Sequence, residues 1–201
     1  MSKKRGSLVV FSGPSGSGKG TVLACAMKKD KDIALSVSAT TRKPREGEVD
    51  GVNYYFKTTE EFEEMIKADG LIEWASFCEN YYGTPRDMVE KNLEEGIDVV
   101  LEIEVQGAMK VKERFPEAVL IFNIPPSMKV LRERLIGRGT ESEEVVEKRL
   151  KTAEWELSQA GKYDYIILND DIETAAREFL SILKSEKCKT SKNEALLKEF
   201  I

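Results

Sequence analysis

The chain has 201 residues, of which 41% are hydrophobic and 33% are charged, so its length and composition predict one large domain with a buried core. The formal net charge of −5 argues against a nucleic-acid partner, and the absence of histidine excludes imidazole as a general base. No apolar stretch has the length of a membrane span and no signal-type segment follows the N-terminus, so we expect a cytoplasmic protein without a membrane partner. Three widely spaced cysteines indicate reduced thiols and neither a disulfide framework nor a zinc site.

The first predicted element is a buried strand that leads into a glycine-rich turn and then a helix. Apolar residues 8–11 precede Gly-Pro-Ser-Gly-Ser-Gly-Lys-Gly-Thr, and helix-forming residues follow from Val22. Glycines let successive backbone N–H groups point into one concavity, and the helix N-terminus adds its positive dipole end. The pattern therefore predicts a triphosphate site in which Lys19 reaches the terminal phosphates. Because Gly20 stands where a Ser or Thr usually contacts Mg²⁺, we expect the metal to be held by Thr21, through water, or by a carboxylate from elsewhere.

The segment from about 36 to 93 mixes short strands and helices. After a short strand at 33–37 we expect a polar loop at 40–51, a strand at 52–57, a helix at 59–68, a strand at 71–77 and a helix from Pro85 to about Glu95. The polar loop sets Arg42 and Arg45 three residues apart among hydroxyl side chains. Arginine binds phosphate oxygens bidentately, although a solvated surface loop is the alternative interpretation.

The end of this segment supplies groups that fit a guanine base. Glu73 is followed by Tyr81, Tyr82, Gly83 and Thr84. A carboxylate accepts hydrogen bonds from the N1–H and N2–H₂ groups of guanine, while a hydroxyl donates to O6 or N7. Adenine has no N2 amine and would leave a buried Glu73 unpaired. The alternative is that Glu73 is an exposed strand residue.

The second half of the chain alternates buried strands with helices. We expect strands at 98–103, 118–124 and 165–168, helices at 106–114, 127–136, 142–159 and 172–184, and a tail at 185–201 that is frayed or ends in a helix. With the phosphate loop after the first strand, this rhythm predicts a doubly wound α/β sheet. The segment 36–93 is then an insertion over the carboxyl edge of the sheet, where ligands bind.

Two groups of charged residues follow these buried strands. Glu102 and Glu104 close the strand at 98–103, and carboxylates in this place commonly hold Mg²⁺ directly or through water. The alternative is a polar strand end that caps the next helix. Two glycines flank Arg138, and the next helix carries Arg149, so both arginines would converge on phosphates if a mobile loop closed. Pairing with the many nearby glutamates is the other interpretation.

Together these segments resemble the guanylate kinase family, and the resemblance covers residues 6–184. Its blocks include Ser-Val-Ser-Ala-Thr-Thr-Arg-Lys-Pro-Arg-Glu-Gly-Glu, Gly-Val-Asn-Tyr-Tyr-Phe, Ile-Glu-Trp-Ala, Asn-Tyr-Tyr-Gly-Thr, Glu-Ile-Glu-Val-Gln-Gly, Arg-Leu-Ile-Gly-Arg-Gly-Thr and Ile-Leu-Asn-Asp-Asp, besides the phosphate loop. The resemblance implies a P-loop NTPase-type parallel sheet flanked by helices, with an inserted GMP-binding subdomain and a helical lid. The implied domain spans 6–185, with its core at 6–35, 94–127 and 151–185, the GMP-binding insertion at 36–93, the lid at 128–150, and a C-terminal tail or helix at 186–201.

The resemblance also implies a role for each matching residue. The GMP phosphate would be held by Ser38, Arg42, Arg45, Tyr54 and Tyr82, and guanine would be read by Glu73, Thr84 and Glu104. ATP would be bound by Gly13, Pro14, Ser15, Gly16, Ser17, Gly18, Lys19, Gly20, Thr21 and, near the base, Asn169. The transferring phosphoryl group would be stabilised by Lys19, Arg42, Arg138 and Arg149, and Mg²⁺ would be held by Thr21 and Glu102, directly or through water. The acids at 102 and 104 are often Asp in the family, which leaves the geometry around Mg²⁺ open.

The expected reaction is Mg²⁺-dependent transfer of the ATP γ-phosphoryl group to GMP, which yields ADP and GDP in purine nucleotide metabolism. The acceptor oxygen is already anionic, so the reaction needs no general base. Two alternatives remain: a guanylate kinase-like module that binds protein ligands without catalysis, and a kinase for another monophosphate or a phosphorylated sugar. The oligomeric state stays open.

Overall fold

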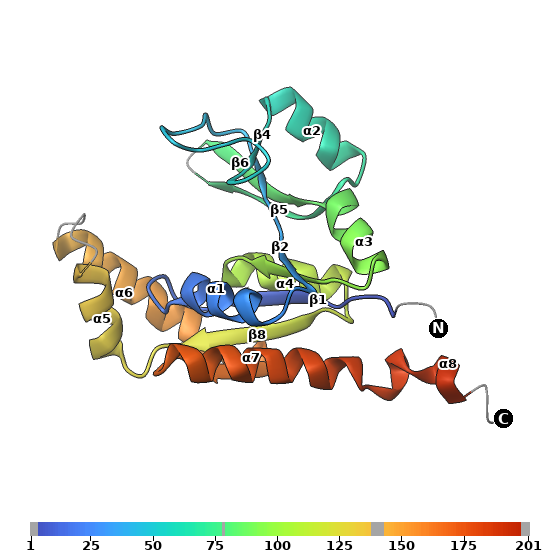
Figure 1. Cartoon of the computed structure of the whole chain (residues 1–201). Coiled ribbons are helices and arrows are strands. Elements are labelled where there is room, and N and C mark those ends of the chain that lie inside the picture. The colour runs from blue at the N-terminus through green and yellow to red at the C-terminus, as the bar shows by residue number, and fades with distance from the viewer. Residues whose placement is uncertain (1–3, 78, 138–142, 198–201) are drawn as a thin grey trace. The chain divides into compact units, whose positions relative to one another are not determined.

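The computed structural model describes residues 4–77, 79–137 and 143–197 and divides the chain into two compact units (Figure 1). Unit 1 comprises Met1–Val10 and Ile33–Ala118, and unit 2 comprises Phe11–Asp32 and Val119–Ile201. The expected Arg138 lies outside the described residues, as does Cys78.

The larger sheet is the central sheet that the alternating pattern predicts. Its described strands are hydrogen-bonded in the order β2-β7-β1-β8-β9, and helices flank it. The strands are β1 (Leu8–Ser12), β2 (Ile33–Leu35), β7 (Asp98–Glu102), β8 (Val119–Ile124) and β9 (Tyr165–Leu168). The pairs β2 with β7 and β8 with β9 are parallel. Strands β1, β7 and β8 are almost wholly buried, which explains why they read as continuous apolar runs in the sequence.

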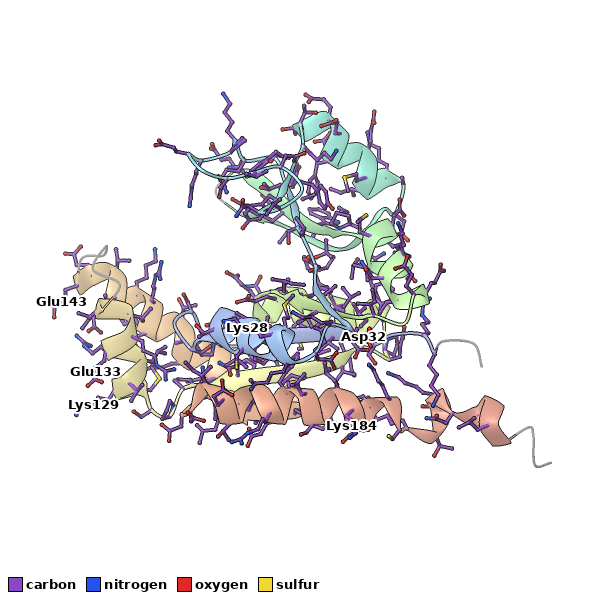
Figure 2. The ribbon with its side chains drawn as sticks, viewed as in Figure 1. Lys28, Asp32, Lys129, Glu133, Glu143 and Lys184 are labelled. Atoms are coloured by element: carbon purple, nitrogen blue, oxygen red, sulfur yellow. The ribbon has the colours of Figure 1, made fainter. Side chains whose placement is uncertain are left out.

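Unit 2 contains the helices that follow the phosphate loop and the later strands. Helices α1 (Lys19–Lys29) and α7 (Ile172–Lys187) lie side by side (Figure 1). An edge-on ring contact joins Phe11 of β1 to Phe179 of α7. Helices α5 (Met128–Ile136) and α6 (Glu143–Ser158) pack together through a cluster formed by Leu131, Leu135, Val146, Leu150 and Ala153. Exposed charged side chains such as Lys129, Glu133 and Lys184 project outward from these helices (Figure 2).

The C-terminal part of unit 2 continues further as helix than the sequence predicts. Helix α7 runs to Lys187, and the short 3₁₀ helix Thr190–Lys192 and helix α8 (Glu194–Leu197) follow it. Within the parts of the chain that are described, no helix is both long enough and apolar enough to cross a membrane.

Unit 1 carries a second, smaller sheet with the strand order β4-β3-β6-β5. Its elements are β3 (Ala39–Thr40), β4 (Tyr55–Phe56), α2 (Thr59–Lys67), β5 (Leu71–Phe77), β6 (Asn80–Pro85) and α3 (Arg86–Glu94), and α4 (Val105–Arg114) follows β7 in the same unit. The fully buried Phe62 of α2 packs with Ala39 and Leu71, and its ring stacks on that of Tyr81 at a centroid distance of 5.3 Å. This core fixes which face of the small sheet is left for other contacts.

Three short elements of unit 1 differ from the sequence-based expectations. Strand β3 was not expected and overlaps the predicted loop only at Thr40. Strand β4 begins only at Tyr55 because a turn with Gly51 at φ 75° occupies its expected first residues. Strand β6 was not expected, since glycine and proline are depleted in strands. A Cβ on Gly83 would lie 2.8 Å from the carbonyl oxygen of Glu73 and 3.1 Å from the Phe62 ring, so glycine allows β5 and α2 to approach β6 closely.

Helix α2 begins with a reciprocal cap, and this gives a first test of the local structure. The Glu61 amide donates to Thr58 Oγ1 at 3.1 Å, and the Thr58 amide donates to Glu61 Oε2 at 2.7 Å. We expect Thr58→Ala to lower the free energy of unfolding by about 1 kcal/mol, because it removes the hydroxyl oxygen that accepts the hydrogen bond of the Glu61 amide. Thr59→Ala is the matched control inside the helix, with an expected change below about 0.5 kcal/mol. Urea denaturation measures both, and equal losses would contradict the assigned cap.

Candidate functional site

The glycine-rich turn after β1 requires glycine at two positions for steric reasons. Gly13 and Gly18 have φ values of 143° and 89°. A Cβ on Gly13 would lie 2.2 Å from the Asn123 carbonyl oxygen, and a Cβ on Gly18 would lie 2.5 Å from Asn169 Nδ2. The turn therefore packs closely against β8 and against Asn169, which follows β9. Its backbone has a conformation that residues other than glycine rarely adopt.

The carbonyl group of Ser17 is the anchor of this turn. It accepts hydrogen bonds from Asn123 Nδ2 at 2.9 Å, Asn169 Nδ2 at 2.7 Å and Arg134 Nη1 at 3.2 Å. Ser17 itself is fully buried. In a trans peptide the C=O and N–H groups point in opposite directions, so three donors that hold the Ser17 oxygen turn the Gly18 N–H away from themselves. The anchor thus fixes the orientation of one amide of the loop.

The first turn of α1 leaves its positive end available to an anion. Its N-cap is Gly18, which makes no side-chain cap, and no acidic residue stands in the first turn. The Lys19 ammonium bends back to donate to the carbonyl oxygens of Gly13 at 2.6 Å and Pro14 at 3.2 Å. A helix dipole and a lysine charge therefore act on the same glycine-rich turn, which is the arrangement that binds phosphate groups.

The loop's expected ATP-binding residues are thus brought together, within unit 2. Gly13, Pro14 and Ser17 are buried, while Ser15, Gly20 and Thr21 are exposed around Gly16 and Gly18. Asn169 lies against the loop, with its Nδ2 on Ser17 and its carbonyl oxygen 3.1 Å from Arg134 Nη2. Its buried Oδ1 makes no hydrogen bond within the described structure.

In unit 1 a buried carboxylate faces a buried hydroxyl. Glu73 on β5 is only 7% exposed, and the fully buried Thr84 on β6 donates from Oγ1 to Glu73 Oε1 at 2.8 Å. A Cβ on Gly107 would lie 3.5 Å from Glu73 Oε2, so the first turn of α4 faces the second oxygen. Burial raises the pKa of Glu73, while the Thr84 hydroxyl and the Lys110 ammonium offset part of the increase. The alternative that Glu73 is an exposed strand residue is therefore wrong, while its expected role in reading a guanine base stays a prediction.

Alternation along β6 separates two roles for its tyrosines. Tyr82 and Thr84 point to one face of the small sheet, and Tyr81 points to the other, where it stacks on Phe62. Tyr81 is thus a core residue. The ring of Tyr82 lies 6.2 Å from that of Tyr54, on the face that also presents Thr84.

The arginine loop is ordered around a glutamate that the sequence analysis did not single out. Arg42 Nη2 donates to Glu48 Oε1 at 2.8 Å, and the Arg45 amide donates to Glu48 Oε2 at 2.7 Å. The guanidinium of Arg42 also lies 5.4 Å from the centroid of the Tyr54 ring. The hydrogen bond that Arg42 donates to Glu48 is the main cause that raises the pKa of Arg42. Arg42, Tyr54 and Tyr82 therefore gather, whereas the side chain of Arg45 is exposed and Ser38 is half-buried beside β3.

The remaining expected residues stand on three other parts of the chain. Glu102 ends β7 and Glu104 is the N-cap of α4, and both are exposed residues of unit 1. Arg149 is half-buried on α6 in unit 2. Among the described residues, no group of three His, Cys, Asp or Glu side chains is arranged to hold a metal ion.

Three functional candidates escaped the sequence analysis: Glu48, Asn123 and Arg134. Asn123 carried a usable signal, because it is a polar residue within the apolar run of β8 and must find a hydrogen-bond partner there. Arg134 and Glu48 carried none, since each stands in a segment rich in charged residues.

Comparison with known proteins finds guanylate kinases that align with almost the whole chain. The guanylate kinase family model matches residues 5–186. A guanylate kinase from Caldanaerobacter subterraneus subsp. tengcongensis is 56% identical and aligned over 96% of this chain and 94% of its own length. Another, from Halalkalibacterium halodurans, is 54% identical over 94% of this chain and 93% of its own. The crystal structure of guanylate kinase from Anaplasma phagocytophilum superimposes with a TM-score of 0.74 at 38% identity, covering 96% of this chain and 92% of that one.

The Ser17 anchor predicts a selective defect in nucleoside triphosphate binding. We expect Asn123→Ala to raise the Kd for ATP about fivefold to tenfold, because one of three donors is lost and the Gly18 amide is less firmly oriented. Titration calorimetry measures this, and GMP affinity serves as the internal control because the residues expected to bind GMP belong to unit 1. Equal weakening of both nucleotides, or none, would contradict the anchoring role.

The raised pKa of Glu73 predicts how its substitution acts on stability. The stability that Glu73 contributes is fully present below the ordinary pKa of 4.5. It is lost as the pH rises through the higher pKa that Glu73 has in the folded protein. Glu73→Gln removes this titration, so the stability of the variant relative to the unsubstituted protein should improve as the pH is raised from below the ordinary pKa into the neutral range. Urea denaturation across this range is the measurement, with the exposed Glu64→Gln as a control that removes a charge from the surface of α2. A relative stability that falls with pH would contradict the assignment.

Proposed function

The chain belongs to the guanylate kinase family, and from this membership we propose that it transfers the γ-phosphoryl group of ATP to GMP, which yields ADP and GDP. Relatives named guanylate kinase are 50–56% identical to this chain over at least 93% of their own length. This agreement over nearly the whole chain disfavours both a non-catalytic interaction module and a kinase for a different acceptor.

The observation that carries the choice of acceptor is the buried pair of Glu73 and Thr84. A carboxylate that is only 7% exposed needs donors, and guanine offers two neighbouring donors at N1–H and N2–H₂. Adenine would meet Glu73 with an acceptor at N1 and leave the carboxylate unpaired, at a large cost in binding free energy. We propose that Glu104, at the start of α4, adds a further contact to the base.

The phosphate of GMP would bind at the other part of the same sheet face. Arg42, Arg45, Tyr54 and Tyr82 supply guanidinium and phenol donors, and Ser38 adds a hydroxyl. Glu48 supports this proposal because it orients Arg42 and the backbone of Arg45 before substrate arrives. Such prior orientation lowers the entropic cost of binding a dianion.

ATP would place its phosphates against the loop 13–18 and the first turn of α1. The oriented Gly18 amide and the ammonium of Lys19 support this proposal, because both act where the terminal phosphates are expected. Asn169, whose buried Oδ1 accepts no hydrogen bond within the described residues, is our proposed contact near the base.

Mg²⁺ would accompany ATP, and the available donors fit it. Magnesium bound with a nucleotide keeps several waters and takes one or two oxygen ligands from protein, so a cluster of three acids is not required. Thr21 and Glu102 are exposed oxygen donors of the right kind and would hold the ion directly or through water. When bound, Mg²⁺ neutralises charge on the β- and γ-phosphates.

The transfer itself requires alignment and charge stabilisation. A GMP phosphate oxygen forms the new bond to the γ-phosphorus as the bond to the bridging oxygen of ADP breaks, and no proton needs to be removed. Lys19, Arg42, Arg138 and Arg149 would stabilise the charge that spreads over the transferring group. Water would compete with GMP, so we propose that the insertion 36–93 and the lid 128–150 close over the substrates. These substrates are nucleotides of the cytoplasm, where we place the protein in purine metabolism.

A coupled assay for ADP, with ATP and Mg²⁺ present, tests the proposal. GMP should support strong turnover, while AMP, UMP and CMP should each support less than about 1% of that rate, because none of them presents two donors to Glu73. Lys19→Ala is the control for the phosphate loop and should lower kcat by at least about 100-fold. Folded protein that turns over none of the four acceptors would contradict the proposal.

A further inference from the structure

Strand β5 is irregular between Leu71 and Trp74, the stretch that contains Glu73. Its register with β6 passes from Leu71 opposite Pro85 to Trp74 opposite Gly83, so three steps along β5 correspond to two along β6. An extra residue of this kind forms a bulge, which bends the strand, redirects a side chain and interrupts the ladder of backbone hydrogen bonds. The direction of Glu73 therefore depends on how this bulge is held.

Arg114, the last residue of α4, supplies donors to the bulge. Its Nη1 donates to the carbonyl oxygens of Leu71 and Ile72, each at 3.0 Å, and its Nη2 pairs with Asp69. One planar guanidinium thus binds three acceptors within four consecutive residues, immediately before Glu73.

Other residues of α4 contact β5 along the same helix face. Lys110 Nζ donates to the Trp74 carbonyl oxygen at 3.1 Å, and a Cβ on Gly107 would lie 3.5 Å from Glu73 Oε2. Residues 107, 110 and 114 are spaced as neighbours on one side of a helix. Helix α4 therefore holds β5 on both sides of Glu73, with Arg114 on the bulge itself.

We propose that Arg114 is a positioning residue for guanine recognition. By binding the Leu71 and Ile72 carbonyl groups it fixes the bulge that directs Glu73 toward Thr84. Arg114 acts through Glu73 and not by contact with the reacting groups. This inference rests on the proposed function, because it concerns the base of the same acceptor.

The test compares GMP with inosine monophosphate, whose base lacks the N2 amine that Glu73 would bind. We expect Arg114→Gln to lower kcat/KM about tenfold for GMP and less than about threefold for inosine monophosphate, because a misdirected carboxylate loses the second donor of guanine. The KM for ATP should change less than about twofold. The ratio of the two specificity constants does not depend on the fraction of folded enzyme, so lost stability alone leaves it unchanged.

Arg86→Gln is the matched control. Arg86 also pairs with Asp69, at 2.7 Å, and its guanidinium lies over the Phe115 ring at 5.5 Å, close to the 5.8 Å of Arg114. Within the described residues, the Arg86 side chain contacts Asp69 and the Phe115 ring and makes no hydrogen bond to the β5 carbonyl groups. The control should therefore keep the unsubstituted ratio, and Arg114→Lys, which retains one ammonium donor, should give an intermediate ratio.

Three outcomes decide the inference. A reduced ratio in Arg114→Gln with an unchanged ratio in Arg86→Gln supports it. An unchanged ratio in Arg114→Gln, or an equal reduction in Arg86→Gln, overturns it, and Arg114→Lys decides in the same way if Arg114→Gln does not fold. An unsubstituted protein that fails to phosphorylate GMP would instead contradict the proposed function.

Discussion

A carboxylate buried away from water costs free energy unless donors meet it, and unit 1 is organised around that constraint at Glu73. The Thr84 hydroxyl meets one oxygen, and Gly107 leaves room at the other. The bulge in β5 and the side chains of α4 direct the carboxylate to this place. A ligand with two neighbouring donors would complete the hydrogen bonding of the carboxylate. The specificity for guanine that we propose therefore follows from the incomplete hydrogen bonding of the buried Glu73 carboxylate.

The phosphate loop of unit 2 follows a related principle, with an oriented dipole in place of a charge. Three side chains from separate elements converge on the Ser17 carbonyl group, and the helix that follows has neither a side-chain cap nor an acid in its first turn. Both of the sites that we propose for nucleotides thus contain polar groups whose direction is fixed before a ligand binds. Prior orientation of this kind is the main source of electrostatic catalysis in phosphoryl transfer.

Local patterns in the sequence predict the larger sheet and the loop well, because a buried parallel strand and a glycine-rich turn each have a composition of their own. Strand β6 escaped prediction because Gly83 and Pro85 oppose strand formation locally, and only its pairing with β3 and β5 makes it a strand. The contact from Asn123 to Ser17 spans 106 residues, so no local pattern indicates it. The roles of the site residues remain predictions, since they depend on substrates and on contacts that arise only when these bind.

The central claim is that Glu73 reads the base of the acceptor and has no part in binding ATP. Steady-state kinetics of Glu73→Gln test it most directly, because the substitution keeps the shape of the side chain and an acceptor for Thr84. We expect kcat/KM for GMP to fall about 100-fold while the KM for ATP changes less than about twofold. Equal losses for the two nucleotides, or an unchanged constant for GMP, would contradict it.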